Sequence, residues 1–144
     1  MAALSGCTAG TPEPAAPKAP DPEHLLLREL IAGKERTIDL YTVLVKAGET
    51  KLAPFLARHE EHLAELRRRL PAEPAPAVSA TPSAPPSPSK KPARVSLSRL
   101  REAERKAAAT RARQLGAASP ALAQLIASIG ACEALHAQAL PRSL

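Results

Sequence analysis

The chain has 144 residues, 16 of them proline, and a formal net charge of +6. Its only aromatic residues are Tyr41 and Phe55, so the core must come from Leu, Ile, Val and Ala, which suits close-packed helices and disfavours β-sheets. The sequence contains no run of roughly 18 apolar residues, so no membrane-spanning helix is predicted. Gly-rich phosphate loops, Gly-x-Ser-x-Gly and paired Cys-x-x-Cys motifs are absent, so nucleotide and hydrolytic chemistry have no support.

Residues 1–22 are expected to form a lipid-anchored tether. The segment Leu4-Ser5-Gly6-Cys7 resembles a bacterial lipobox, in which small residues allow cleavage before a Cys that carries lipid. The Pro/Ala/Thr-rich stretch after Cys7 has the composition of a linker. Because a signal peptide needs a basic start and an apolar run of roughly 7–15 residues, this interpretation requires a start upstream of Met1. We expect a lipid on Cys7 and a cell-envelope location on the outer face of the cytoplasmic membrane. The alternative, if no upstream signal exists, is the cytoplasm.

Residues 23–70 have the pattern of a helical hairpin. Its first helix is expected to open at Asp21-Pro22-Glu23, where acid and proline suit the first turn, and to stop at Gly48. The second helix has Thr50 as a candidate N-cap and ends at Pro71. The apolar positions expected to face the core are Leu27, Leu30, Ile31, Ile38, Tyr41, Val45, Leu52, Phe55, Leu56, Leu63 and Leu66.

Residues 71–94 contain eight prolines and are expected to form a linker without regular structure. In polyproline form this linker reaches about 70 Å, whereas a twenty-residue helix is about 30 Å long. It is therefore long enough to return the chain from one end of a bundle to the other.

Residues 95–144 have the pattern of a second hairpin. Ser96 or Ser98 is expected to cap its first helix, Gly116 to end it, and Ser119-Pro120 to open the next helix. The expected inward positions are Leu97, Leu100, Ala103, Ala107, Leu115, Leu122, Leu125, Ile126, Ile129 and Leu140. Two hairpins joined by one long crossover predict a single all-α domain, an antiparallel four-helix bundle.

The two hairpins carry acidic and imidazole groups at corresponding positions. Glu35-Arg36 aligns with Glu104-Arg105, and His59-x-x-His62 aligns with Glu133-x-x-His136. Each of these acidic and imidazole groups follows an apolar position by three, four or seven residues, so all are expected on or near the buried stripes. The candidate metal ligands are Glu35, His59, His62, Glu104, Glu133 and His136. Because a buried charge costs several kcal/mol unless it is paired or bound to metal, their convergence predicts a metal site or a buried hydrogen-bond network.

This pattern resembles the ferritin-like superfamily, particularly small actinobacterial lipoprotein-type members with a ferritin-like domain, over residues 24–70 and 95–140. The resemblance implies a Glu from the first and third helices and Glu-x-x-His from the second and fourth, around iron or another divalent ion. In this reading Glu35, Glu104, Glu133, His136 and His62 match the family ligands. His59 stands where the family has a bridging Glu, and histidine cannot bridge two ions as a carboxylate does. The resemblance therefore implies a mononuclear or mixed His/Glu site.

Two other functions remain open at this point. The bundle could be a metal-free structural or partner-docking domain, in which His59 pairs with Glu133 or Glu35. It could also bind a polyanion such as nucleic acid, because residues 90–113 hold nine basic residues against two acidic ones. No aromatic residues interleave with these charges, and a solvated helix face plus linker accounts for them. Cys132 is expected to act as a small buried hydrophobe, and the scarcity of large apolar residues suggests a homodimer.

Overall fold

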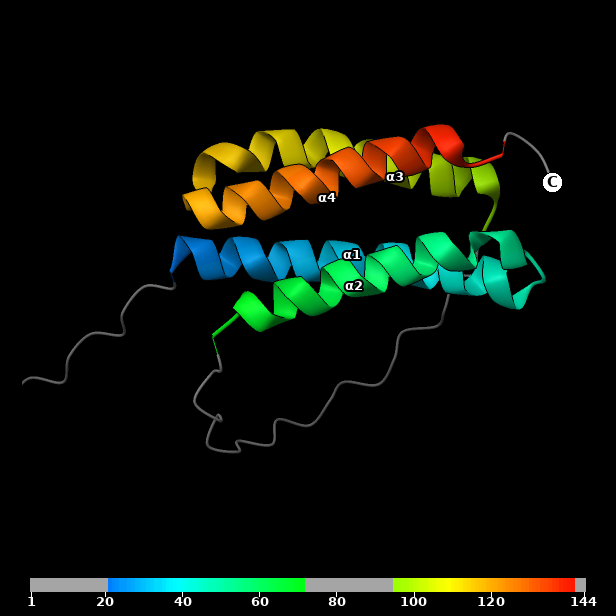
Figure 1. Ribbon diagram of the computed structural model, residues 1–144, viewed down its shortest axis with the longest axis horizontal. Coiled ribbons are helices and arrows are strands. Elements are labelled where there is room, and N and C mark those ends of the chain that lie inside the picture. The colour runs from blue at the N-terminus through cyan, green and yellow to red at the C-terminus, as the bar shows by residue number, and fades with distance from the viewer. Residues whose placement is uncertain (1–20, 72–94, 142–144) are drawn as a thin grey trace, which may run out of the picture.

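The computed structural model describes residues 21–71 and 95–141, and within these ranges it is all-helical. It contains α1 (Pro22–Lys46), η1 (Thr50–Leu52), α2 (Ala53–Arg69), α3 (Leu97–Gln114), η2 (Leu115–Ala117) and α4 (Pro120–Ala139). Figure 1 shows α1 and α2 lying side by side beneath α3 and α4. The four helices form a bundle-like fold, as expected. The predicted lipidation site at Cys7, the tether and nearly all of the predicted linker lie outside the described residues.

Several helix ends follow the predicted capping residues. The Asp21 carboxylate accepts a hydrogen bond of 2.8 Å from the backbone N–H of Glu23, which satisfies one of the free donors at the start of α1. Ser96 plays the same part for α3, accepting from the backbone N–H of Arg99 at 3.3 Å. After α1 the chain turns at Gly48, whose φ of 106° is a conformation that a side chain would oppose.

The capping prediction for Thr50 is wrong, and that for Ser119 is confirmed in its position at the start of α4. Thr50 does not cap α2, because it begins the short 3-10 helix η1, which leads directly into Ala53. Ser119 precedes α4 as expected, but its side chain makes no bond to the first turn of that helix. Its backbone N–H and hydroxyl instead bond to the carboxylate of Glu23 at 2.8 and 3.1 Å, tying the start of α4 to the start of α1.

Two hydrophobic clusters hold the bundle together. The first consists of Leu26, Leu27, Leu30, Leu66, Leu122, Ile126 and Ile129. The second consists of Tyr41, Leu44, Leu52, Leu97, Leu100 and Leu140. Each buried side chain of this size contributes roughly 1.5–3 kcal/mol, so these clusters supply much of the stability. A polar layer lies between the two clusters, and all four helices contribute to it. Its residues include Lys34, His59, Glu104, Arg111, Gln114, Glu133 and His136.

The buried seam of α1 agrees with the predicted one at Leu27, Leu30 and Tyr41 and differs from it at three other positions. Its buried positions are spaced three and four residues apart, at Leu27, Leu30, Lys34, Thr37, Tyr41 and Leu44. Ile31, Ile38 and Val45, which were expected to line the core, are half-buried at its edge. Leu115 was also expected inside and is 36% exposed, because it lies in η2 beyond the end of α3.

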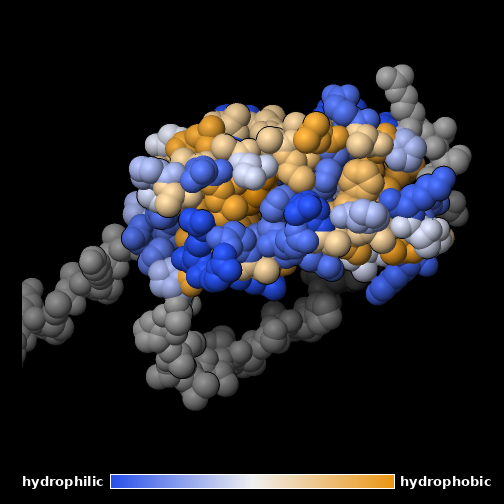
Figure 2. All heavy atoms as spheres, viewed as in Figure 1, coloured by the Kyte–Doolittle hydropathy of each residue, from blue (hydrophilic) through white to orange (hydrophobic). Residues whose placement is uncertain are grey.

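The outer faces of the helices differ in polarity. In Figure 2 the exposed side of α2 is largely hydrophilic, whereas the surface over α4 is pale or hydrophobic. The one Asp, Glu, Lys or Arg residue of α4 is Glu133, which is buried, and Leu135 is 68% exposed on its outer face. Among the described helices, none combines the length and apolar character needed to cross a bilayer.

Candidate metal centre

Three side chains of the polar layer meet at one point in the bundle. His59 comes from α2, Glu104 from α3 and His136 from α4, and one possible ligand atom of each lies within 4.8 Å of the other two. His59 Nε2 is 2.7 Å from Glu104 Oε1, and His136 Nδ1 is 3.1 Å from His59 Nε2. The third edge, from His136 Nδ1 to Glu104 Oε1, measures 3.4 Å. We call these three side chains the triad.

Each member of the triad also contacts one further polar side chain. The Tyr41 hydroxyl donates to Glu104 Oε1 at 2.6 Å, and Lys34 Nζ lies 3.1 Å from His59 Nδ1. The Sγ atom of Cys132, one turn before His136 on α4, lies 3.3 Å from the Nε2 atom of that residue. These contacts hold the two rings and the carboxylate in one orientation.

Glu133 lies in the same layer but is held by cations instead of by the triad. Lys34 Nζ donates to Glu133 Oε1 at 2.6 Å, and Arg111 Nη2 donates to the same oxygen at 3.2 Å. Arg111 also donates to Gln114, which in turn donates to Glu29 on α1. The layer is therefore a continuous network whose two buried carboxylates are matched by two cations.

The protonation states follow from burial and from these contacts. Burial raises the pKa of Glu104, but the hydrogen bonds of His136 and His59 outweigh it and bring the pKa to about 2. Burial is also the main cause that lowers the pKa of His59 and that of Lys34, the latter against the attraction of Glu133. Burial, with Glu104 beside it, raises the pKa of Tyr41, so the phenol stays a donor. The triad thus offers an ionised carboxylate and a neutral His59 ring. Because Lys34 donates to Nδ1, this ring carries its proton on Nε2 and donates it to Glu104. For an ion to bind at Nε2, Lys34 would have to withdraw so that the proton can move to Nδ1.

Some buried polar atoms of this region have no hydrogen-bond partner among the described residues: Glu104 Oε2, Glu133 Oε2, His62 Nδ1 and Arg111 Nε. Buried acceptors without partners are uncommon, because each costs roughly 1–3 kcal/mol. A cation coordinated by Glu104 would satisfy its second oxygen, so the residues present are compatible with a metal ion.

Of the six predicted ligands, the structure brings His59, Glu104 and His136 together. Glu133 is in the same layer but bonded to Lys34 and Arg111. The His62 ring is next to that of His59, with 6.3 Å between ring centroids, and is half-buried. The predicted inward position of Glu35 is wrong, because its side chain is 44% exposed and pairs with Arg67 at 2.6 Å.

Lys34 occupies the core position that was predicted for Glu35. Its side chain is fully buried. The signal for it was present in the sequence, because Lys34 follows Leu30 by four residues and precedes Tyr41 by seven. The charge of Lys34 argued against a core position, because lysine is rarely buried without a partner. Tyr41 packs in the core as expected, and no sequence signal indicated the bond of its hydroxyl to Glu104. Cys132 was expected to be a small buried hydrophobe, but it is half-buried and its Sγ contacts His136 Nε2 at 3.3 Å.

The described part of the basic segment does not form one charged face. Arg111 is buried, Arg105 lies 3.5 Å from Glu102, and Arg101 donates to the carbonyl of Leu140 at the end of α4. Three of the basic side chains in this segment therefore have partners within the bundle itself or are buried in it.

Comparisons of the chain with known protein families, with curated proteins and with solved structures find no match.

Proposed function

We propose that the bundle binds one divalent transition-metal ion through His59 Nε2, Glu104 and His136 Nδ1. The observation that carries the proposal is the convergence of these three atoms from three helices, with edges of 2.7, 3.1 and 3.4 Å. Around a tetrahedral ion with bonds near 2.0–2.1 Å, ligand atoms are roughly 3.3 Å apart. A small outward shift of His59 and Glu104 would therefore create the coordination triangle.

The donor set favours zinc or ferrous iron. Two imidazoles and one carboxylate form the ligand set of many catalytic zinc sites and of mononuclear iron sites, each with positions left open. Magnesium and calcium prefer oxygen ligands, so a site with two nitrogen donors disfavours them.

One ion, not two, is expected in this layer. Lys34 Nζ bonds to both Glu133 and His59, at 2.6 and 3.1 Å, and so supplies a fixed positive charge beside the triad. Glu133, the carboxylate that a second ion would need, already bonds to both Lys34 and Arg111. Removing the Lys34 ammonium should therefore strengthen binding at the triad, because like charges repel over this distance.

The proposal includes a ferritin-like architecture and a place in the cell envelope. The all-helical bundle and the histidines and carboxylates in its core support a ferritin-like relationship with two antiparallel hairpins. The lipobox-like segment at Cys7 supports a lipid anchor. Mass spectrometry of the chain expressed in a bacterial host with its upstream sequence would detect a diacylglyceryl group on Cys7, and an unmodified Cys7 would contradict the anchor.

A second candidate is a metal-free scaffold, and one specific observation favours it. The Glu133 carboxylate already pairs with Lys34 and Arg111, and Glu104 already bonds to Tyr41 and to His59, because the triad edges are also hydrogen-bond distances. In this alternative the Lys34 ammonium supplies the positive charge that a metal ion would otherwise supply, and the layer serves only to fix how the helices pair.

Metal titration of the purified full chain separates the two candidates. After chelator treatment, the protein is titrated with Zn²⁺, and anaerobically with Fe²⁺, against a chromophoric competitor. We expect one ion per chain, and a loss of at least about a hundredfold in affinity for Glu104→Gln and His136→Gln. Glu35→Gln and His24→Gln, which change an exposed carboxylate and an exposed imidazole, should bind like the parent chain. Lys34→Met should bind more tightly than the parent chain.

Absence of stoichiometric metal, or equal binding by Glu104→Gln and Glu35→Gln, would leave the metal-free scaffold as the function. Circular dichroism of each variant distinguishes loss of the site from loss of the fold.

A further inference from the structure

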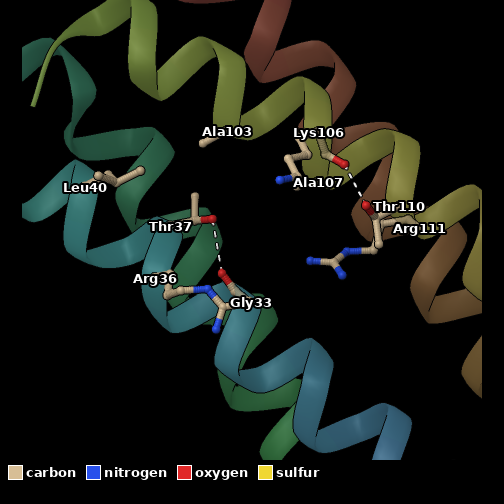
Figure 3. Close-up of a pocket in the computed structure, with 9 residues that line it drawn as sticks. All are labelled: Gly33, Arg36, Thr37, Leu40, Ala103, Lys106, Ala107, Thr110 and Arg111. Carbon is tan, nitrogen blue, oxygen red and sulfur yellow. Dashed lines mark hydrogen bonds between the residues drawn. The ribbon is translucent and has the colours of Figure 1, made fainter.

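A cavity of about 250 Å³ lies between α1 and α3, apart from the triad. Figure 3 shows that its walls come from one face of each helix. The cavity exists because small residues face one another there: Gly33 on α1, and Ala103 and Ala107 on α3. Larger side chains at these positions would fill the space between the helices.

The cavity collects positive charge. Arg36 of α1 and Lys106 and Arg111 of α3 line it, and none of its lining residues in the described chain is Asp or Glu. The exposed side chains of Arg36 and Lys106 have no ion pair within the described residues. Arg111 already pairs with Glu133, so Arg36 and Lys106 give the cavity two positive charges that an anion would balance.

Two guanidinium groups approach the same point on the cavity wall. A Cβ atom placed on Gly33 would lie 3.6 Å from Arg111 Nη2 and 3.7 Å from Arg36 Nη2. Both guanidinium groups therefore lie at ordinary contact distance from this one point on the wall. Arg111 is only 6% exposed, and its Nε has no hydrogen-bond partner although the other two nitrogens bond to Glu133 and Gln114. A buried guanidinium with an unused donor is a fixed part of the wall.

We propose that this cavity binds a phosphate-type oxyanion, either inorganic phosphate or the head group of a small phosphomonoester. Arg36 and Lys106, which have no ion pair among the described residues, supply two positive charges that match a dianion. Arginine forks also suit tetrahedral oxyanions. The Thr37 and Thr110 hydroxyls line the wall but donate to the carbonyls of Gly33 and Lys106, so the basic side chains are the donors for the anion. Leu40 and Ala103 give the wall an apolar side. That side has room for a short carbon chain beside the head group.

The oxyanion site is independent of the proposed metal. Its ligand contacts come from α1 and α3, and no triad residue lines the cavity. Failure of metal binding would therefore leave this proposal intact, and failure of phosphate binding would leave the metal proposal intact.

Calorimetric titration of the full chain at physiological chloride concentration tests the proposal, with inorganic phosphate in one arm and glycerol 3-phosphate in the other. We expect saturable binding of one ligand per chain. Arg36→Gln and Lys106→Gln should each weaken binding by about tenfold, the usual effect of losing one charged hydrogen bond. Arg111 is left unchanged, because it also holds Glu133.

Two further variants make the test specific to the cavity. Ala107→Leu fills the cavity without changing charge and should abolish binding, with folding checked by circular dichroism. Arg99→Gln removes the same charge from an exposed position of α3 outside the cavity and should change the affinity by less than about twofold. Tighter binding of glycerol 3-phosphate assigns the site to a phosphomonoester, and tighter binding of phosphate assigns it to the free ion. Binding of neither ligand, or equal weakening by Arg99→Gln and Arg36→Gln, would overturn the proposal.

Discussion

The apolar clusters and the polar layer occupy the same helix seams but contribute to the molecule in opposite ways. On α4 the seam runs from Ile126 and Ile129 to Glu133 and His136, and then to Leu140, without a change in spacing. The apolar ends stabilise the fold by burial. The middle must be kept in balance by paired charges, because each unpaired one would cost several kcal/mol. A protein that needed only stability would place leucines there, so the polar layer points to a function.

Loss of a charge in the polar layer should have the largest effect on stability. Glu133→Ala leaves Lys34 and Arg111 as buried cations without their shared carboxylate. We expect the free energy of unfolding to fall by about 3–5 kcal/mol in urea titration. Glu35→Ala, which removes a carboxylate from an exposed pair, should cost less than about 1 kcal/mol. Similar losses in the two variants would mean that Glu133 is not held as described.

Truncation of a side chain in an apolar cluster should lower the free energy of unfolding slightly less than Glu133→Ala does. Ile126 is completely buried, so Ile126→Ala should cost about 2–5 kcal/mol through lost burial and the cavity left behind. Leu135→Ala, at a position 68% exposed on the same helix, should stay within about 0.5 kcal/mol of the parent chain. Thermal unfolding followed by circular dichroism compares them. A large loss in Leu135→Ala would indicate that the outer face of α4 is covered, for example by the predicted second copy.

The close approach of α3 and α4 depends on Gly130. A Cβ atom at this position would lie 2.9 Å from Arg111 Cβ, a distance that the two helices cannot accommodate without moving. Gly130→Ala is therefore expected to destabilise by about 1–3 kcal/mol from overpacking, less about 1 kcal/mol regained from helix propensity. Gly116→Ala meets nothing within 4 Å and is the matched control. A more stable Gly130→Ala would show that α3 and α4 are further apart than described.

The pH dependence of stability should distinguish the histidines from the carboxylate. Burial, with the charge of Lys34, lowers the pKa of His62 to about 4, below the ordinary value near 6.5. The unfolded chain therefore binds more protons between pH 6.5 and 4, and stability should fall as pH drops through this window. The lowered pKa of His59 acts in the same direction.

Glu104, with a pKa of about 2, should add a further loss as pH falls below about 4.5. His62→Gln should flatten the upper window and leave the lower one unchanged. Urea titrations between pH 7 and 3 measure both, and an unchanged slope above pH 4.5 in His62→Gln would contradict the buried neutral state of that ring.

Much of the fold was predictable from local signals. The N-caps Asp21 and Ser96, the turn at Gly48 and the stop before Pro71 all follow from short-range chemistry, which depends on few neighbouring residues. Thr50 does not cap α2 because the short helix η1 begins there. Ser119 is at the N-cap position of α4, but its hydroxyl bonds to Glu23 of α1 instead of to the first turn.

The site was less predictable, because it depends on how each helix is rotated. Glu104 and His136 lie on seams with strong apolar flanks, so their inward direction could be inferred. On α1 two neighbouring lines of residues both had helical spacing, and the choice between Lys34 and Glu35 depended on which line faced the bundle. Only the packed structure reveals that a lysine can be buried there, because its partners Glu133 and His59 come from other helices.

The central claim is that the triad holds a single metal ion, and X-ray absorption spectroscopy of the zinc-loaded full chain tests it most directly. The account predicts a first shell of nitrogen and oxygen atoms near 2.0–2.1 Å with the scattering pattern of two imidazoles. It also predicts no metal–metal vector, and loss of the imidazole pattern in His136→Gln. A sulfur shell near 2.3 Å, a second metal, or an ion bound by water alone would contradict it.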